Sequence, residues 1–142
     1  MNIDTCLKEG YLIRIKSNQK DLIEKEIKEA EYDLEKAKES FEEEDFKWCI
    51  VKAYYAMFHI SKALLFKLGY KEKRHFAIEI VLEELNKNGK LEIEYINNFK
   101  AALSAREDAD YHYIYSKDNA EYILENAEEF IERISKLIKI LK

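Results

Sequence analysis

Apolar side chains recur at steps of three and four residues along most of this chain, and this rhythm limits the possible folds more than any other feature. Over residues 19–44 the stripe runs without a fault, while Lys and Glu fill the other faces. Its members are Ile23, Ile27, Ala30, Leu34, Ala37 and Phe41. That spacing is the repeat of one helix face. Because the chain has no proline and only three glycines, few residues oppose helix formation, and an all-α protein is predicted.

The same reasoning divides the rest of the chain into further helices. The most apolar one covers residues 45–68, with Asp45 as its N-cap and Gly69 as its terminator. Three more helices are expected, over residues 74–86, over residues 92–115, and from residues 116–118 to the C-terminal end. Short loops between long helices favour an antiparallel four-helix-type bundle with additional short helices.

The N-terminal residues 1–17 carry a short amphipathic pattern that Gly10 interrupts. They are expected to form a brief helix or turn packed on the bundle. Ser17 and Asn18 supply a start signal for the long helix that follows. We find neither an internal repeat nor a low-complexity linker in the sequence, so residues 1–142 are predicted to form a single domain.

Charge and composition exclude some classes of function. A net charge of −5 disfavours a protein that coats nucleic acid through a broad basic surface, but it allows a small pocket that handles phosphate. Cys6 and Cys49 give neither a disulfide framework nor the spacing of metal ligands. The charged N-terminal residues do not resemble a signal peptide. A cytoplasmic protein is therefore expected.

The apolar run over residues 48–68 could be mistaken for a membrane span. It contains four basic side chains: Lys52, His59, Lys62 and Lys67. A buried helix is therefore predicted, and no membrane contact. On this helix, His59 is expected to be a hydrogen-bonded core histidine, and Tyr54 and Tyr55 are expected to be core or interface aromatics whose hydroxyls reach a polar partner.

Ionisable side chains interrupt an apolar stripe in the segment AALSAREDADYHYIY, residues 101–115. Continuing the helical spacing of Leu103 leads to Arg106 and Asp110, and His112 follows shortly after. A guanidinium can hold a phosphate, and an imidazole can transfer protons near neutral pH. The sequence also allows a simpler interpretation, in which Arg106 pairs with Asp110 on a solvated helix face.

Two other groups of residues are candidates for a binding site, one for metal ions and one for phosphate. A di-metal carboxylate bundle needs two Glu-x-x-His pairs, and only Glu72 with His75 has that spacing, so no metal site is predicted. The densest basic patch, Lys71, Lys73, Arg74 and His75, precedes a helix whose N-terminal amides attract anions. It predicts either a phosphate-backbone contact or a polar loop that balances neighbouring acids.

Several stretches together resemble one known family. The segments KAYYAMFH, AREDADY and the terminal AEYILENAEEFIERI are similar to the HEPN domain family, in particular to its small stand-alone branch encoded beside minimal nucleotidyltransferases. The resemblance covers roughly residues 12–134. It implies a helical homodimer and, in active members, a metal-independent endoribonuclease whose motif is Arg, four to six residues, then His. Arg106 and His112 fit that motif.

The resemblance also implies partners. The family includes toxin–antitoxin pairs in which the cognate nucleotidyltransferase silences the toxin, in some cases by adenylylating a tyrosine just past the His, and the resemblance implies such a pair here. That motif places Tyr two residues after the His, where this chain has Ile114 between Tyr113 and Tyr115. Neither a metal nor another cofactor is implied.

Helix geometry tests the motif independently. Residues six apart on one helix are separated by about 9 Å along the axis and by about a third of a turn. Arg106 and His112 of one chain would diverge unless the helix ends or bends, so we predict a composite site at the twofold axis of a homodimer. There Arg106 would stabilise phosphoryl oxygens and His112 would act as general acid or base. The residues expected to bind substrate are Asp110, Tyr113, Tyr115, Lys73, Arg74 and His75.

The sequence leaves two alternatives to an RNA-cleaving enzyme. One is a non-catalytic subunit that binds nucleotide or docks a nucleotidyltransferase, with Arg106 as an anion clamp. The other is a purely structural bundle, if Arg106 and Asp110 form only a surface pair.

Overall fold

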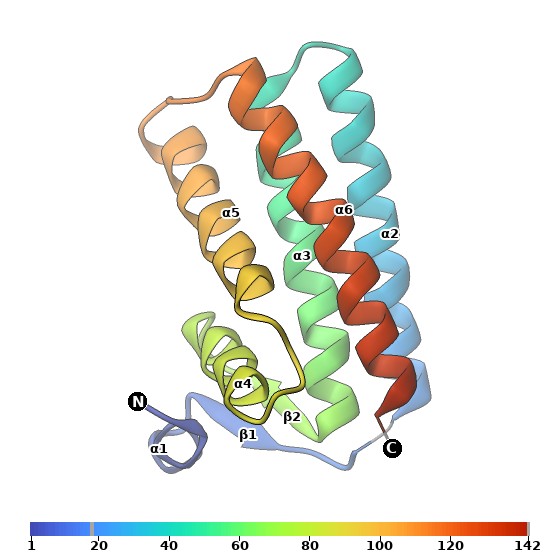
Figure 1. Cartoon of the computed structure of the whole chain (residues 1–142), viewed down its shortest axis with the longest axis vertical. Coiled ribbons are helices and arrows are strands. Elements are labelled where there is room, and N and C mark those ends of the chain that lie inside the picture. Colours follow the sequence, from blue (N-terminus) through green and yellow to red (C-terminus); the bar gives the residue numbers. More distant parts are fainter. Residues whose placement is uncertain (18, 142) are drawn as a thin grey trace.

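The computed structural model describes residues 1–17 and 19–141. Over these residues the chain forms six helices and two short strands, and Figure 1 shows the four longest helices standing side by side. The elements are α1 (Ile3–Glu9), β1 (Leu12–Arg14), α2 (Lys20–Glu42), α3 (Phe46–Leu68), β2 (Tyr70–Glu72), α4 (Phe76–Lys87), α5 (Ile93–Tyr111) and α6 (Lys117–Ile140). The all-α class is confirmed.

Helix α3 is the centre of the bundle, since it packs against α2, α5 and α6. In Figure 1 the long helices alternate in direction, as an antiparallel bundle requires. Tyr54 of α3, Phe99 of α5 and Phe130 of α6 meet in the core, with ring centroids 5.9 and 5.8 Å apart for consecutive pairs. Burying each such side chain contributes about 1.5–3 kcal/mol. This aromatic core fixes α5 against α3, which determines where Arg106 lies.

Helix α3 begins and ends at the residues predicted from the sequence. The Asp45 carboxylate accepts a hydrogen bond from the Trp48 backbone N–H at 3.3 Å, and Gly69 ends the helix with φ of 90° in the left-handed region. By length and composition α3 could cross a membrane, but 78% of its most apolar window is buried inside the structure. That burial is typical of the core helix of a bundle.

The two strands are absent from the sequence prediction. Leu12, expected in a helix or turn, pairs with Glu72 in an antiparallel ladder, and Arg14 pairs with Tyr70. Three-residue strands are too short to show an alternating pattern. Their pairing, together with a bond of 2.9 Å from the Ile15 N–H to the Gly69 carbonyl, holds the N-terminal segment against the end of α3.

The start of α2 also differs from the prediction. Asn18 lies outside the described residues, and the helix begins at Lys20, with Gln19 rather than Ser17 in the cap position. The Gln19 side-chain amide donates to the Lys16 carbonyl at 2.9 Å. Helix α4 likewise begins at Phe76, two residues later than the sequence indicated.

Gly69 is a position where the backbone itself requires glycine. Its φ is +90°, and a Cβ there would lie 3.3 Å from the Ile15 carbonyl oxygen and 3.3 Å from the Ser17 Cβ. We expect Gly69→Ala to lower the free energy of unfolding by about 2 kcal/mol, measured by urea denaturation. Gly89→Ala is the matched control, because φ is +73° but a Cβ meets nothing within 4 Å. It should cost about 1 kcal/mol, and equal losses would contradict the role of the close approach.

Candidate functional site

Helix α5 ends earlier than the sequence prediction of residue 115, and this changes where His112 lies. Its last residue is Tyr111, and His112 occupies the cap position. The backbone N–H groups of His112 and Ile114 both donate to the Asp108 carbonyl, at 3.1 and 3.0 Å. Tyr113 adopts φ of 57°, which costs a non-glycine residue about 1–2 kcal/mol. The chain therefore turns out of the helix immediately after the proposed general acid or base.

Arg106 points from α5 toward α3 and is not on a solvated face. Its Nη2 donates to the Tyr55 hydroxyl at 3.1 Å. The guanidinium carbon lies 5.5 Å from the ring centroids of Tyr54 and Tyr55 and 5.7 Å from that of Tyr111, within the range of cation–π attraction. Only 14% of the side chain is exposed. Three tyrosines thus hold a fixed positive charge near the surface.

Asp110 completes the surroundings of Arg106. Its Oδ2 lies 3.4 Å from the Arg106 Nε, so the pair considered from the sequence exists, but it is largely buried. Within the part of the chain that the structure describes, neither this Nε nor the Tyr54 hydroxyl has a hydrogen-bond partner, and burial raises the pKa of Tyr54 to about 12. Buried polar atoms without a partner are rare in folded proteins, and a bound water, an ion or a catalytic role can explain them.

His112 is accessible to a substrate. Its side chain is 63% exposed, and its Nδ1 lies 3.2 Å from the Asp108 carboxylate. A carboxylate at Nδ1 orients the ring and directs Nε2 away from the helix. The structure therefore pairs Asp110 with Arg106 and Asp108 with His112.

Exposed aromatic side chains surround this end of the bundle. We call Trp48, Tyr111, Tyr113 and Tyr115 the aromatic rim; all four are exposed, and Tyr113 has 76% of its surface accessible. The Lys47 ammonium lies 5.8 Å from the Tyr113 ring centroid and 5.4 Å from the Trp48 ring, which connects the start of α3 to the loop after α5. Such flat, exposed rings next to a cation can stack on unpaired bases.

The basic residues between β2 and α4 lie elsewhere. The backbone N–H groups of Lys73 and Arg74 donate to the Tyr11 carbonyl at 2.8 and 3.3 Å, and the His75 ring packs 4.7 Å from the Phe58 ring centroid. In Figure 1 the strands and α4 occupy the end of the bundle opposite the α5–α6 connection. The structure does not bring these three residues together with His112, and their role in binding substrate stays a prediction.

A second polar group lies between α2 and α3. The His59 Nδ1 is hydrogen-bonded to Glu26 at 3.1 Å, which confirms the expectation of a hydrogen-bonded histidine, and that bond raises the pKa of His59. Glu29, Asp33 and His59 place three potential metal-ligand atoms within 4.8 Å of one another. Two of these side chains belong to α2 and one belongs to α3. The sequence could show only the helical spacing of Glu29 and Asp33, because the approach of His59 depends on how the two helices pack.

Comparison with known proteins identifies the chain. A family model described as "HEPN domain" matches residues 23–137. The chain belongs to the HEPN family. The HEPN match extends from the first buried residue of α2 to the last turns of α6, and it confirms the family that the sequence resembled. Arg106 and His112 lie within the matched region.

Three relatives match most of the chain. The Archaeoglobus fulgidus "UPF0332 protein" is 35% identical over 116 residues, which are 80% of this chain and 92% of that protein. "Putative toxin MJ0605" of Methanocaldococcus jannaschii is 33% identical over 135 residues, 84% of this chain and 97% of that protein. "Putative toxin MJ0142" of the same organism is 29% identical over 119 residues, 82% and 81% of the two chains.

Proposed function

We propose that this HEPN protein is a metal-independent endoribonuclease and the toxin of a toxin–antitoxin pair. The observation that carries the proposal is a largely buried guanidinium, Arg106, followed at the end of the same helix by an exposed imidazole, His112. One can hold an anion and the other can move a proton. The names of two relatives describe toxins, and they favour the toxin part of the proposal.

The chemistry follows from what these groups can do. His112 accepts the proton of a ribose 2′-hydroxyl, whose oxygen attacks the adjacent phosphorus. Arg106 stabilises the negative charge that develops on the phosphoryl oxygens. The bond from phosphorus to the 5′-oxygen breaks, and that oxygen receives a proton from a second imidazole or from water. The products are a 2′,3′-cyclic phosphate and a 5′-hydroxyl, and the step as proposed needs no metal ion.

We further propose that the active form is a homodimer in the cytoplasm. A twofold axis next to the end of α5 would place two copies of Arg106 and of His112 along one groove, and it would cover part of the aromatic rim, which is exposed in one chain. A cognate minimal nucleotidyltransferase is the proposed antitoxin. Position 114, two residues after His112, is an Ile, so this chain departs from the family motif for tyrosine adenylylation.

A second function is favoured by one observation. Asp110 lies 3.4 Å from Arg106 and the net charge is −5, so the site attracts RNA weakly at long range. This favours a non-catalytic subunit in which Arg106 clamps a nucleotide or the nucleotidyltransferase.

Incubation of the purified protein with RNA in EDTA separates the two functions. An endoribonuclease gives chelator-resistant cleavage and fragments that end in 2′,3′-cyclic phosphate. Intact RNA together with measurable binding of a nucleotide or of the nucleotidyltransferase would refute the enzyme and select the non-catalytic subunit. The fragment ends are identified with a phosphatase, which removes the terminal phosphate only after the cyclic ester has been opened.

The aromatic rim makes a separate prediction about substrate binding. If Tyr113 and Tyr115 stack on bases, each change to Ala should raise KM for RNA by about 5- to 150-fold, because stacking contributes about 1–3 kcal/mol per base. The kcat should change little. Tyr32→Ala is the matched control, since Tyr32 is also an exposed tyrosine but belongs to α2. An equal rise in KM for the control would show that the rim has no special role.

A further inference from the structure

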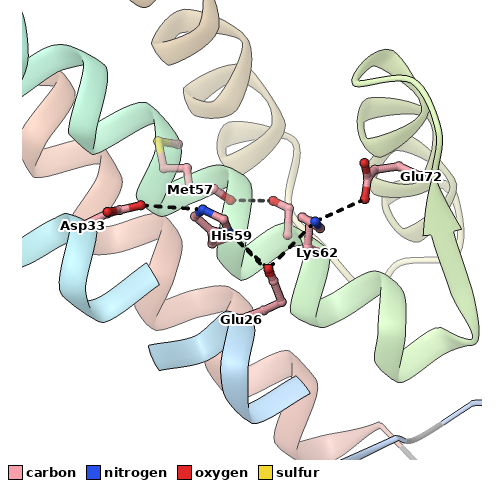
Figure 2. A network of polar contacts seen from close by, with 7 residues as sticks. Glu26, Asp33, Met57, His59, Lys62 and Glu72 are labelled. Carbon is pink, nitrogen blue, oxygen red and sulfur yellow. Dashed lines mark hydrogen bonds and ion pairs between the residues drawn. The ribbon is translucent and has the colours of Figure 1, made fainter. Parts of the chain in front are cut away.

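The histidine of α3 that faces α2 is held between two carboxylates. Figure 2 shows the His59 ring between Asp33 and Glu26, with Lys62 beyond Glu26. The His59 Nδ1 lies 3.1 and 3.3 Å from the two Glu26 oxygens. The opposite nitrogen, Nε2, lies 3.7 Å from the Asp33 Oδ2. The ring therefore has one hydrogen-bonded nitrogen and one that faces a carboxylate without a bond of ordinary length.

Glu29 adds a third potential ligand to this pair. It precedes Asp33 by one helical turn on α2. Ligand atoms of Glu29, Asp33 and His59 lie within 4.8 Å of one another. His59 and Asp33 are half-buried, whereas Glu29 is exposed. One imidazole and two carboxylates from facing helices are the kind of set that holds metal ions inside helical bundles.

The distance between His59 and Asp33 suits a shared ion better than a direct contact. Two ligand atoms each about 2.1 Å from a zinc ion at a tetrahedral angle lie about 3.4 Å apart. The distance of 3.7 Å from Nε2 to Oδ2 is close to that value and is too long for a hydrogen bond. Glu26 at Nδ1 supplies the carboxylate that orients most metal-binding histidines and leaves Nε2 free for the metal.

The charges around the three side chains leave room for a cation. Lys62 lies 3.9 Å from Glu26 and 3.8 Å from Glu72, so its ammonium is shared between those two carboxylates. Lys52, which also acts on Asp33, donates to the Ser40 hydroxyl at 2.9 Å. Burial raises the pKa of Asp33, because removal from water disfavours the charged form of a carboxylate.

We propose that Glu29, Asp33 and His59 bind one divalent transition-metal ion of the zinc class, with water at its open position. An imidazole with two carboxylates matches Zn²⁺ in ligand type. The ion would tie α2 to α3 and stabilise the bundle. The site is separate from the proposed ribonuclease site, because Arg106 contacts α3 through Tyr54 and Tyr55 while His59 faces α2.

The test uses the full chain, stripped with EDTA, then dialysed and titrated with ZnCl₂ by calorimetry. We expect one zinc ion per chain and a rise of roughly 5 °C in Tm at saturating zinc. Co²⁺ in place of zinc should give visible absorption bands of a site with one nitrogen ligand. The proposal would be overturned if zinc did not raise Tm, or if zinc bound only at a stoichiometry other than one ion per chain.

Variants locate the ion. Glu29→Gln and Asp33→Asn should each weaken zinc binding at least tenfold, and Glu29 is exposed, so its variant is expected to fold normally. Glu26→Gln should weaken binding about 10-fold through the orientation of His59. Glu72→Gln is the matched control, because Glu72 contacts Lys62 of the same network but is outside the ligand set. Equal affinity in all four variants would place zinc elsewhere and refute the site.

Discussion

Replacement of Arg106 by alanine is expected to lower kcat for RNA cleavage by about 10²- to 10³-fold, because removal of one group that stabilises developing negative charge has that effect in other enzymes. The Arg106 guanidinium lies among three tyrosine rings and donates to Tyr55 at 3.1 Å. Arg106→Lys should lose at least tenfold as well, since an ammonium cannot reproduce the planar fork. Single-turnover cleavage in EDTA measures both variants.

Arg133 provides the matched control for this substitution. It is also a half-buried arginine with a carboxylate partner, and its Nε lies 2.7 Å from Glu92, but it joins α6 to the start of α5, far along that helix from residue 106. Arg133→Ala should cost about 1 kcal/mol of stability and leave the cleavage rate within a factor of two. If Arg106→Ala cleaves as fast as the native protein while circular dichroism shows it folded, the proposed role of Arg106 is wrong.

The helices could be predicted because their signals are local. The apolar stripe of α2 and the caps Asp45 and Gly69 act within a few residues, and the structure shows both caps in place. Of the residues 116–118 at which the sequence allowed the last helix to begin, Ser116 is the N-cap. The strands could not be predicted, because Leu12 and Glu72 pair across a distance in sequence that no local pattern encodes. The end of α5 was misplaced for another reason. Tyr113 adopts a left-handed φ of 57° that sequence rules assign to glycine or asparagine.

The candidate site also contains local features, which could be predicted, and contacts between segments, which could not. Arg106, Asp110 and His112 could be proposed from spacing and from the family resemblance, because they share one segment. Tyr55 as the partner of Arg106 depends on how α5 packs on α3, and Asp108 as the partner of His112 depends on the turn that ends α5. The approach of His59 to Asp33 depends in the same way on the packing of α2 against α3.

His112→Ala should reduce kcat by about 10²- to 10⁴-fold, the range that general acid–base groups supply. The side chain is 63% exposed and lies just beyond the last residue of α5, so its loss should change the free energy of unfolding by less than about 0.5 kcal/mol. A loss of activity together with unchanged stability distinguishes a chemical role from a structural one. Asp108→Asn, which alters the partner of Nδ1 at 3.2 Å, should lower kcat about tenfold without changing KM.

The same variants test whether two chains share the site. If Arg106 of one protomer acts with His112 of its partner, mixing Arg106→Ala with His112→Ala and allowing subunits to exchange should restore cleavage. Random exchange makes half of the dimers mixed, and each mixed dimer retains one of its two Arg–His combinations, so about a quarter of the native activity is expected. Neither variant alone can recover, which makes the background low. An inactive mixture whose subunits have exchanged would refute a site in which one Arg106 and one His112 from opposite chains are enough for cleavage.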